Sequence, residues 1–197
     1  MWEERYQTDD YVFGTSPAQF LADHAAYLKP GLTALCVADG EGRNSVFMAQ
    51  RGLNVTALEY APSAIEKARK LAAEKDVRVD FRQVDVTAHD WPRTYDIVAG
   101  IFIQFLGPDA RDTLHQHMKR SVAPGGLMML HGYTPEQIEY KTGGPPHAEN
   151  MYTPALLAED FAGWEILENR AYTREINEGR EHAGLSALID FIARKPL

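Results

Sequence analysis

The chain has 197 residues, of which 45% are hydrophobic and 24% are charged, and its formal net charge is −8 at pH 7. This length and composition predict one globular domain with a sizeable core, and the acidic charge argues against nonspecific nucleic-acid binding, which needs surplus cations to displace phosphate counterions. The charged start MWEERYQTDD differs from a signal peptide, and the longest apolar run, IVAGIFIQFL, has about half the length of a membrane span, so we expect a cytoplasmic protein without a membrane partner.

Short apolar runs alternate with helical patterns from residue 32 onward. The runs predict strands at 32–38, 54–60, 77–85, 95–103 and 127–133. The helical patterns between them predict helices at 44–52, 64–75 and 109–122. Ser63 and Glu66 form an S-x-x-E capping box, which predicts the start of the second helix. Strands that alternate with helices are typical of an α/β fold with a doubly wound parallel sheet.

The last part of the chain has a different pattern. Two strand-like runs, 164–176 and 182–195, are joined by NEGRE, and a short connection with a glycine favours an antiparallel hairpin. The whole chain therefore predicts a Rossmann-like, mostly parallel sheet of seven strands with one antiparallel strand near an edge.

Ligands of such sheets bind beyond the carboxyl ends of the parallel strands. The loops that matter are therefore 38–45, 59–63, 85–91, 101–109 and 131–153. The hairpin turn 177–182 joins them if the strand before it runs parallel to the first strand.

The first of these loops lies in the stretch LCVADGEGRNSVFMAQRG, residues 35–52. Gly40 and Gly42 allow a tight turn and a close approach to a ligand. The amides at the start of the following helix offer positive partial charge. A third glycine of dinucleotide-binding folds is replaced by Ser45, and the two-glycine turn alone is weak support for any ligand.

Two acidic residues end the next two predicted strands. Glu59 can accept hydrogen bonds from both hydroxyls of a ribose, a feature that nicotinamide and S-adenosylmethionine folds share. Asp85 can accept a hydrogen bond from an adenine amino group, while the amide of Val86 meets a ring nitrogen. A cap or turn role for Asp85 is the alternative. Together, Glu59 and Asp85 indicate a site that reads ribose and then adenine.

In this order and spacing, CVADGEGRN, VTALEYAPSAIEKARKLA, VDFRQVDV, YDIVAGIFIQFL and VAPGG resemble the class I S-adenosylmethionine-dependent methyltransferases. The resemblance spans nearly the whole chain and implies a single methyltransferase domain over 1–197, with a lid segment 1–30 and a Rossmann-like core 31–197. Two positions depart from the family pattern, since Cys36 stands where an acid is common and Ala38 stands where the first glycine is common.

The resemblance implies S-adenosylmethionine as cofactor. In a site of the kind that this resemblance implies, Asp39 would hold the amino group of the methionine part of the cofactor. The contacts that it implies from the core are Asp39, Gly40, Gly42, Asn44, Glu59, Tyr60, Asp85, Val86 and Ile101.

The N-terminal segment MWEERYQTDDYVFGTSPAQFL is similar to the lid of tellurite-resistance, thiopurine and thiol methyltransferases. The similarity implies that aromatic and basic side chains cover the cofactor, among them Trp2, Arg5, Tyr6, Tyr11 and Phe13. Arg5 would pair with the methionine carboxylate through two hydrogen bonds. The alternative is a surface helix whose aromatic rings dock on the core.

Methyl transfer needs an aligned acceptor and a site from which water is excluded. A thiolate acceptor needs no strong base, whereas an amine or imidazole needs a group that takes its proton. The catalytic candidates are Tyr6, Tyr11, His131, His147, Glu178 and His182. Pairing of the last strand with the fifth would bring His182 near His131. The alternatives are a core histidine at 131, a loop residue at 147 and a simple turn at Glu178.

We therefore expect an S-adenosylmethionine-dependent methyltransferase whose small-molecule acceptor reacts through sulfur, nitrogen or a metalloid. The alternatives are a nicotinamide-dependent oxidoreductase (NAD as cofactor) and a non-catalytic sensor of an adenosyl ligand. His115 and His117 lie two apart on a helix and face different ways, and no Cys/His cluster for zinc is apparent, so we expect no metal site. The sequence leaves monomer and homodimer open.

Overall fold

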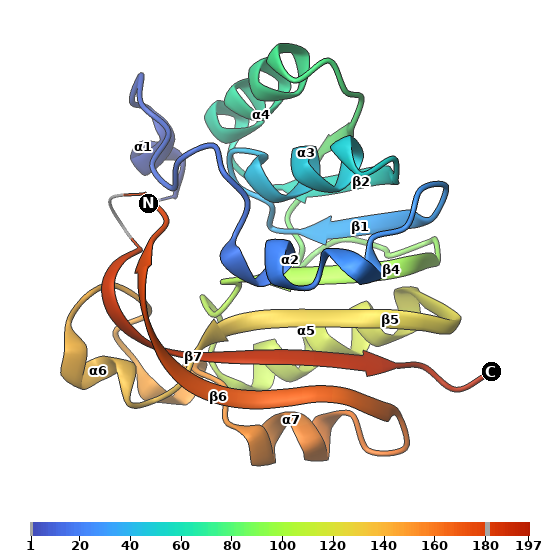
Figure 1. Cartoon of the computed structure of the whole chain (residues 1–197), viewed down its shortest axis with the longest axis vertical. Helices are drawn as coiled ribbons and strands as arrows, with labels where there is room; N and C mark the ends of the chain where they lie inside the picture. Colours follow the sequence, from blue (N-terminus) through green and yellow to red (C-terminus); the bar gives the residue numbers. More distant parts are fainter. Residues whose placement is uncertain (1, 180–181) are drawn as a thin grey trace. The chain divides into compact units, whose positions relative to one another are not determined.

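The computed structural model describes residues 2–179 and 182–197 (Figure 1). These residues form two compact units. The first unit runs to Asp90 and includes Glu178 and Gly179, whereas the second comprises 91–177 and the chain from His182 onward. Arg180 and Glu181 of the predicted hairpin turn lie outside the described residues.

The first unit contains three parallel strands in the order β3-β2-β1. Its elements are α1 (Trp2–Tyr6), α2 (Gln19–Asp23), the 3-10 turn η1 (Ala25–Tyr27), β1 (Thr33–Val37), α3 (Arg43–Gln50), β2 (Asn54–Glu59), α4 (Pro62–Glu74) and β3 (Asp80–Gln83). The predicted first strand is one residue longer than β1 at each end, and the predicted second strand is one residue longer than β2 at its carboxyl end. The third is shorter than predicted, because Val77 still donates to the Ala72 carbonyl at the end of α4, 3.0 Å away.

The start of α4 corrects the predicted capping box. The helix begins at Pro62, and its N-cap is Ala61, which has no capping side chain. Ser63 therefore lies inside the helix, where its amide and hydroxyl donate to the carboxylate of Glu3 at 3.1 and 2.5 Å. Proline at the first helical position supplies a favourable φ, and an acid from a distant segment satisfies the free amide.

The second unit contains four strands in the order β4-β5-β7-β6 (Figure 1). Its elements are β4 (Tyr95–Ile101), α5 (Pro108–Ser121), β5 (Val122–Tyr133), α6 (Gln137–Tyr140), the 3-10 turn η2 (Ala148–Asn150), α7 (Pro154–Asp160), β6 (Glu165–Asn177) and β7 (Ala183–Arg194). β4 and β5 are parallel, whereas β7 is antiparallel to both β5 and β6.

The predicted fold class is confirmed by these strand directions. Seven strands are present in the described part of the chain, and β7 is the one that runs against its paired neighbours. The predicted pairing of the last strand with the fifth is also confirmed, with His131 opposite Asp190 and Tyr133 opposite Leu188. Cys36 is a buried free thiol, and burial raises its pKa.

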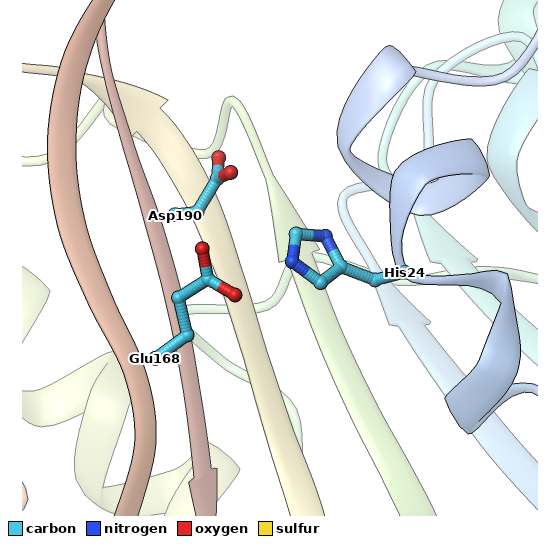
Figure 2. A group of neighbouring side chains, drawn as sticks. All are labelled: His24, Glu168 and Asp190. Atoms are coloured by element: carbon cyan, nitrogen blue, oxygen red, sulfur yellow. The ribbon is translucent and has the colours of Figure 1, made fainter.

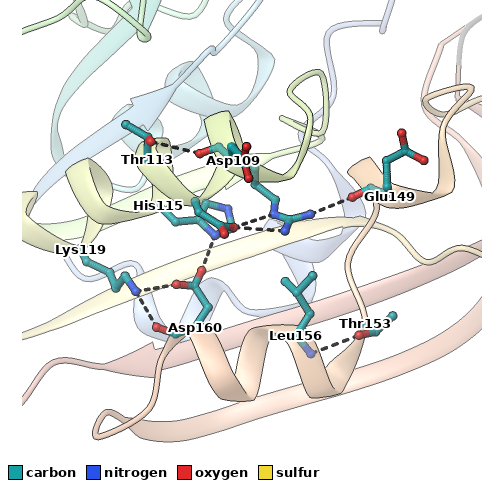
Figure 3. A network of polar contacts seen from close by, with 10 residues as sticks. Asp109, Thr113, His115, Lys119, Glu149, Thr153, Leu156 and Asp160 are labelled. Carbon is teal, nitrogen blue, oxygen red and sulfur yellow. Dashed lines mark hydrogen bonds and ion pairs between the residues drawn. The ribbon is translucent and has the colours of Figure 1, made fainter.

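A polar network fixes α7 to α5 within the second unit (Figure 3). His115 and Lys119 of α5 contact the two carboxylate oxygens of Asp160, each at 2.5 Å. Burial raises the pKa of Asp160, but the hydrogen bonds from His115 and Lys119 outweigh it and leave that pKa below its ordinary value. His117 instead stacks on Trp91, at 5.7 Å between ring centroids, so the two histidines face different ways.

None of the described helices combines the length and the apolar character needed to cross a bilayer.

Candidate functional site

The loop between β1 and α3 alternates in backbone conformation. Ala38, Gly40 and Gly42 all have positive φ, at 49°, 66° and 88°. An alanine in the left-handed region costs roughly 1–2 kcal/mol, so the position where the family pattern has glycine is also the position where this backbone favours glycine. At Gly42 a Cβ would lie 2.7 Å from the Cβ of Ala68, which makes glycine a requirement for packing α3 against α4.

Asp39 closes this loop onto the start of α3. Its carboxylate accepts from the Ser45 hydroxyl at 2.5 Å and from the Ser45 amide at 3.3 Å. Burial raises the pKa of Asp39 to about 6, although the Ser45 hydrogen bonds act in the opposite direction. The serine in place of a third glycine is therefore the partner of Asp39, and the half-buried carboxylate is a place where a cation would be stabilised.

Glu59 joins the carboxyl ends of β1 and β2. Its Oε2 accepts from the amide of Gly40 at 2.8 Å, and its Oε1 accepts from the amides of Tyr60 and Ala61, both at 2.8 Å. Burial raises the pKa of Glu59, with the three amides opposing that shift. A carboxylate has about four acceptor positions, so the three amides leave room for one further donor.

Asp85 lies two residues beyond β3 and is exposed. Its Oδ1 accepts from the Thr87 amide at 2.9 Å and from the Thr87 hydroxyl at 2.6 Å, and these bonds lower the pKa of Asp85. This geometry is that of a turn, the alternative role for Asp85, and it uses one of the two carboxylate oxygens. Val86, the next residue, is buried.

The N-terminal segment is attached to this loop through its backbone amides. Glu41 is 2% exposed, and its Oε2 accepts from the amides of Val12 and Phe13 at 2.8 and 3.3 Å. Its Oε1 forms an ion pair with Lys67 of α4 at 2.8 Å. Asn44, at the start of α3, accepts from the amide of Ala18 at 2.9 Å. The loop therefore holds the segment that precedes α2.

Glu178 and Gly179, from the turn between β6 and β7, hold the same segment. Glu178 accepts from the amide of Gln19 at 3.0 Å and forms a buried ion pair with Arg43 at 2.9 Å. A Cβ on Gly179, whose φ is +84°, would lie 2.4 Å from the Phe13 backbone. The carboxylate of Glu178, a predicted catalytic group, is thus engaged in capping α2 and pairing with α3.

The aromatic residues of the N-terminal segment occupy two different positions. Tyr6 is buried, its ring stacks with that of Trp2 at 6.1 Å between centroids, and the Arg5 guanidinium lies 5.0 Å from the Trp2 ring centre. Burial and the nearby carboxylates of the loop raise the pKa of Tyr6. Tyr11 instead donates to the carbonyl of Lys67 at 3.0 Å, which fixes it on α4. Tyr60, at the end of β2, is 60% exposed.

In the second unit, Phe102 contacts several side chains at the carboxyl end of β4. Ile101, the last residue of β4, lies opposite His131, and Phe102 follows it with a φ of 56°. The Phe102 ring lies 4.8 Å from the ring of His131, 5.0 Å from that of Tyr133 and 4.2 Å from that of His182, measured between centroids. Strained residues of this kind concentrate at functional sites.

His131 is held by Asp190. Its Nδ1 lies 2.8 Å from Oδ1 of Asp190, and both side chains are almost completely buried. The same oxygen accepts from the Tyr172 hydroxyl at 2.9 Å, and the Arg170 guanidinium lies 3.5 Å from Oδ2. Figure 2 shows Asp190 on β7 and Glu168 on the neighbouring strand β6. Glu168 in turn accepts from Arg170 at 3.2 Å.

His182 has Tyr133 as its polar partner. Its Nδ1 lies 2.5 Å from the Tyr133 hydroxyl, and its backbone forms a bridge with Gly143. The strand register places Asp190, not His182, opposite His131. Both histidines nevertheless contact one ring, that of Phe102. His147 lies elsewhere, exposed in the loop before η2, where its carbonyl accepts from the Asn150 amide at 3.1 Å.

Sequence reasoning missed Phe102, Asp190 and Tyr172. A signal was present for Asp190, because it is the one charged residue within the otherwise apolar run ALIDFIA of a predicted strand. A charge in such a run is costly to bury without partners, so its position indicates a buried pair. Phe102 and Tyr172 carry no comparable signal, since aromatic residues are ordinary in strands.

The chain is similar to known proteins in sequence and in structure. Residues 34–126 match the family described as "Methyltransferase domain". The chain is 38% identical over 146 residues to "Ubiquinone biosynthesis O-methyltransferase" of Xanthomonas campestris pv. campestris (strain B100), an alignment that covers 68% of this chain and 61% of that protein. It spans 44% of the corresponding protein of Pseudomonas paraeruginosa (strain DSM 24068 / PA7), so it matches only about half the length of such relatives.

Two solved structures share the fold at low sequence identity. TehB from Haemophilus influenzae has a TM-score of 0.73 and 19% identity, over 98% of this chain and 65% of that one. The N-methyltransferase NodS from Bradyrhizobium japonicum WM9, in complex with S-adenosyl-L-homocysteine, has a TM-score of 0.72 and 13% identity, over 100% of this chain and 97% of that one. At these identities the likeness concerns the fold.

Proposed function

We propose that the chain is a class I S-adenosylmethionine-dependent methyltransferase, which transfers the methyl group of this cofactor to a small-molecule acceptor. The observation that carries the proposal is the arrangement around Glu59. One carboxylate fixes the glycine loop after β1 and the end of β2 together, and it retains capacity for one more donor. A ribose hydroxyl is such a donor.

The residues of the first unit fit the cofactor chemically. Asp39 offers a half-buried carboxylate whose raised pKa reflects burial, and a cation such as the methionine ammonium would offset that cost. At Gly40 a Cβ would lie 3.1 Å from the Tyr6 hydroxyl, so glycine allows the close approach of Tyr6 to this turn, whereas Gly42 serves the packing of α3 against α4. The fit to the cofactor is therefore one of charge.

The assignment of individual contacts follows from this fit. Glu59 would bind the ribose, Asp39 the methionine ammonium, and the unused oxygen of Asp85 with the Val86 amide the adenine. Arg5 would meet the methionine carboxylate, and Trp2 and Tyr6 would cover the cofactor. The remaining predicted contacts are Gly40, Gly42, Asn44, Tyr60 and Ile101. When bound, S-adenosylmethionine supplies an electrophilic methyl group on a sulfonium.

The acceptor side is assigned to the side chains around Phe102. Among the predicted catalytic residues, His131 and His182 are gathered there, and Tyr6 lies at the glycine loop. The side chains of Tyr11 and Glu178 are engaged on α4 and on Arg43, and His147 is exposed in a loop. The name of the 38%-identical relative favours oxygen as a nucleophile beside the sulfur, nitrogen and metalloid atoms that the sequence analysis predicts.

Calorimetry with S-adenosylhomocysteine and with NADH tests the proposal on the wild-type chain. We expect micromolar binding of the first ligand and none of the second. Absence of S-adenosylhomocysteine binding would overturn the proposal, and NADH binding in its place would support the oxidoreductase alternative. Tight binding without methyl transfer to thiols, amines, phenols or metalloid oxyanions would favour the sensor. A cytoplasmic location stays a prediction from the sequence.

A further inference from the structure

The strongest unassigned feature is the buried carboxylate of Asp190. Its side chain is 1% exposed in the middle of β7, between apolar neighbours. An ionised carboxylate in such a place is unfavourable unless charged and polar partners surround it. The structure supplies these partners from two other strands, so Asp190 is the centre of a network and not an isolated charge.

The partners of Asp190 hold it in one orientation. On β6, the Tyr172 hydroxyl donates to Oδ1 at 2.9 Å and Arg170 approaches Oδ2 at 3.5 Å. Burial and the Asp190 charge both raise the pKa of Tyr172, which keeps its hydroxyl a donor. Nδ1 of His131 lies 2.8 Å from the same oxygen. Because an ionised carboxylate can only accept hydrogen bonds, Nδ1 carries the hydrogen of this bond.

The Nδ1–H tautomer of His131 makes its Nε2 atom the basic nitrogen of the ring. When Nδ1–H donates to a carboxylate, the lone pair of a neutral imidazole is on Nε2, and the carboxylate stabilises the imidazolium that forms when Nε2 takes a proton. The ring that carries this nitrogen is level with the carboxyl end of β4 and touches Phe102, at the edge where ligands of such sheets bind.

We propose that Asp190 is a positioning residue that holds His131 as the proton acceptor of the reaction, and that the methyl acceptor is accordingly a hydroxyl or N–H compound. This inference rests on the proposed methyltransferase function and names the substrate class of that site. A thiolate or a metalloid oxyanion has no proton to give up, so the network would serve no purpose for such acceptors.

The reaction balances with the groups present. The oxygen or nitrogen of the acceptor forms a bond to the methyl carbon while the carbon–sulfur bond breaks, and that electron pair remains on sulfur. The proton of the acceptor passes to Nε2 of His131. The resulting imidazolium is paired with Asp190, and the pair returns its proton to water after product release.

Nuclear magnetic resonance of the full chain labelled with ¹⁵N-histidine tests the positioning role without any acceptor. His131→Gln identifies the His131 signals among those of the seven histidines. We expect neutral His131 to show a protonated Nδ1 and an unprotonated Nε2. In Asp190→Asn the carboxamide can donate to Nδ1, which would move the ring proton to Nε2. A protonated Nε2 in the wild type, or an unchanged tautomer in Asp190→Asn, would refute the role.

Tyr172→Phe is the matched control. It removes the other donor to Oδ1 of Asp190 and leaves the carboxylate and the imidazole in place, so the His131 tautomer should persist. If the tautomer changed equally in Tyr172→Phe, general disruption of the network would explain the result, and the specific role of Asp190 would be lost. Asp190→Glu keeps the charge, and we expect it to retain the wild-type tautomer.

A second arm measures methyl transfer to four probes: 3,4-dihydroxybenzoate, histamine, dithiothreitol and selenite. We expect transfer to the hydroxyl or N–H probes, with kcat lower by about 10²–10⁴-fold in Asp190→Asn and KM and S-adenosylhomocysteine affinity nearly unchanged. Transfer confined to dithiothreitol or selenite, or full kcat in Asp190→Asn, would contradict the inference. Calorimetry with S-adenosylhomocysteine reports separately on the proposed function.

Discussion

The two units place polar groups in different ways. In the first, side-chain acceptors bind backbone amides: Glu59 takes three, Glu41 takes two, and Asn44 and Glu178 take one each. In the second, the polar side chains around Phe102 bind one another, as in His131 with Asp190 and Tyr133 with His182. The first arrangement fixes the course of the chain, whereas the second fixes the direction of rings.

This difference has an energetic side. A charged acceptor that holds several amides stabilises the backbone of a loop, so its loss exposes several unsatisfied donors at once. A side-chain pair can be removed together with little residual cost when both members are replaced. We therefore expect larger losses of stability from the first unit and larger losses of turnover from the second.

The largest effect is expected for Glu178→Ala. This change leaves Arg43 buried without its partner, and removal of one member of a buried pair costs about 3–5 kcal/mol of unfolding free energy. Urea denaturation measures the loss. The double variant with Arg43→Met should recover part of it, and equal stability of the single and double variants would show that the ion pair contributes little.

Gly179→Ala tests the close approach of the turn to the N-terminal segment. Gly163 has the same backbone conformation, with φ of 85° against 84°, but no atom lies within 4 Å of its added Cβ. Gly163→Ala should therefore cost about 1–2 kcal/mol for strain alone, and Gly179→Ala about 1–3 kcal/mol more for the clash. Equal losses in urea denaturation would mean that the segment moves aside freely.

Glu59→Gln addresses cofactor binding directly. A carboxamide cannot accept from three amides and a ribose as a carboxylate does, and loss of a hydrogen bond to a charged group costs about 1.5–3 kcal/mol. We expect S-adenosylhomocysteine affinity to fall by about 10–150-fold in calorimetry. An unchanged Kd would place the ribose elsewhere and remove Glu59 from the site.

Asp39 makes two properties depend on pH in opposite directions. Its pKa in the folded chain is about 6, above the ordinary 3.8, so the unfolded chain loses this proton first. Stability of the free protein should therefore fall as pH rises from about 4 to 6. Affinity for the cationic cofactor should rise over the same range, by up to about tenfold per pH unit, and Asp39→Asn should flatten both profiles. A pH-independent Kd in the wild type would remove Asp39 from the site.

Tyr133→Phe is expected to have the smallest effect on stability. It removes one hydroxyl from a buried pair with His182, which corresponds to about 1 kcal/mol. Thermal unfolding measures the shift, and His182→Phe combined with it should cost little more. A loss above about 3 kcal/mol, as for the buried ion pair, would erase the distinction between the two units.

The sequence predicted features that depend on local pattern. The strand ends at Glu59, the glycines at 40 and 42 and the hairpin followed from periodicity and turn chemistry, and the comparisons confirm the fold. The Ser63–Glu66 capping box failed because Glu3, sixty residues away, caps the helix instead. A local pattern carries no information about such an acceptor.

The candidate site depends on strand register and long-range contacts more than the fold does. That Asp190 lies opposite His131 follows only from the pairing of β5 with β7, and a shift of one residue would place it on the other face. Glu178 was a reasonable catalytic candidate from its place in a turn. Its engagement with Arg43 and Gln19 depends on contacts across more than a hundred residues.

The bond from the Gln19 amide to Glu178 also bears on how the chain is made. The two residues are 159 positions apart, and a ribosome adds roughly 5–20 residues per second. The N-terminal segment is therefore synthesised roughly 10–30 seconds before its last acceptor exists. Until then the amides at the start of α2 have only part of their final partners, so this segment completes its native hydrogen bonds only after Glu178 has been synthesised.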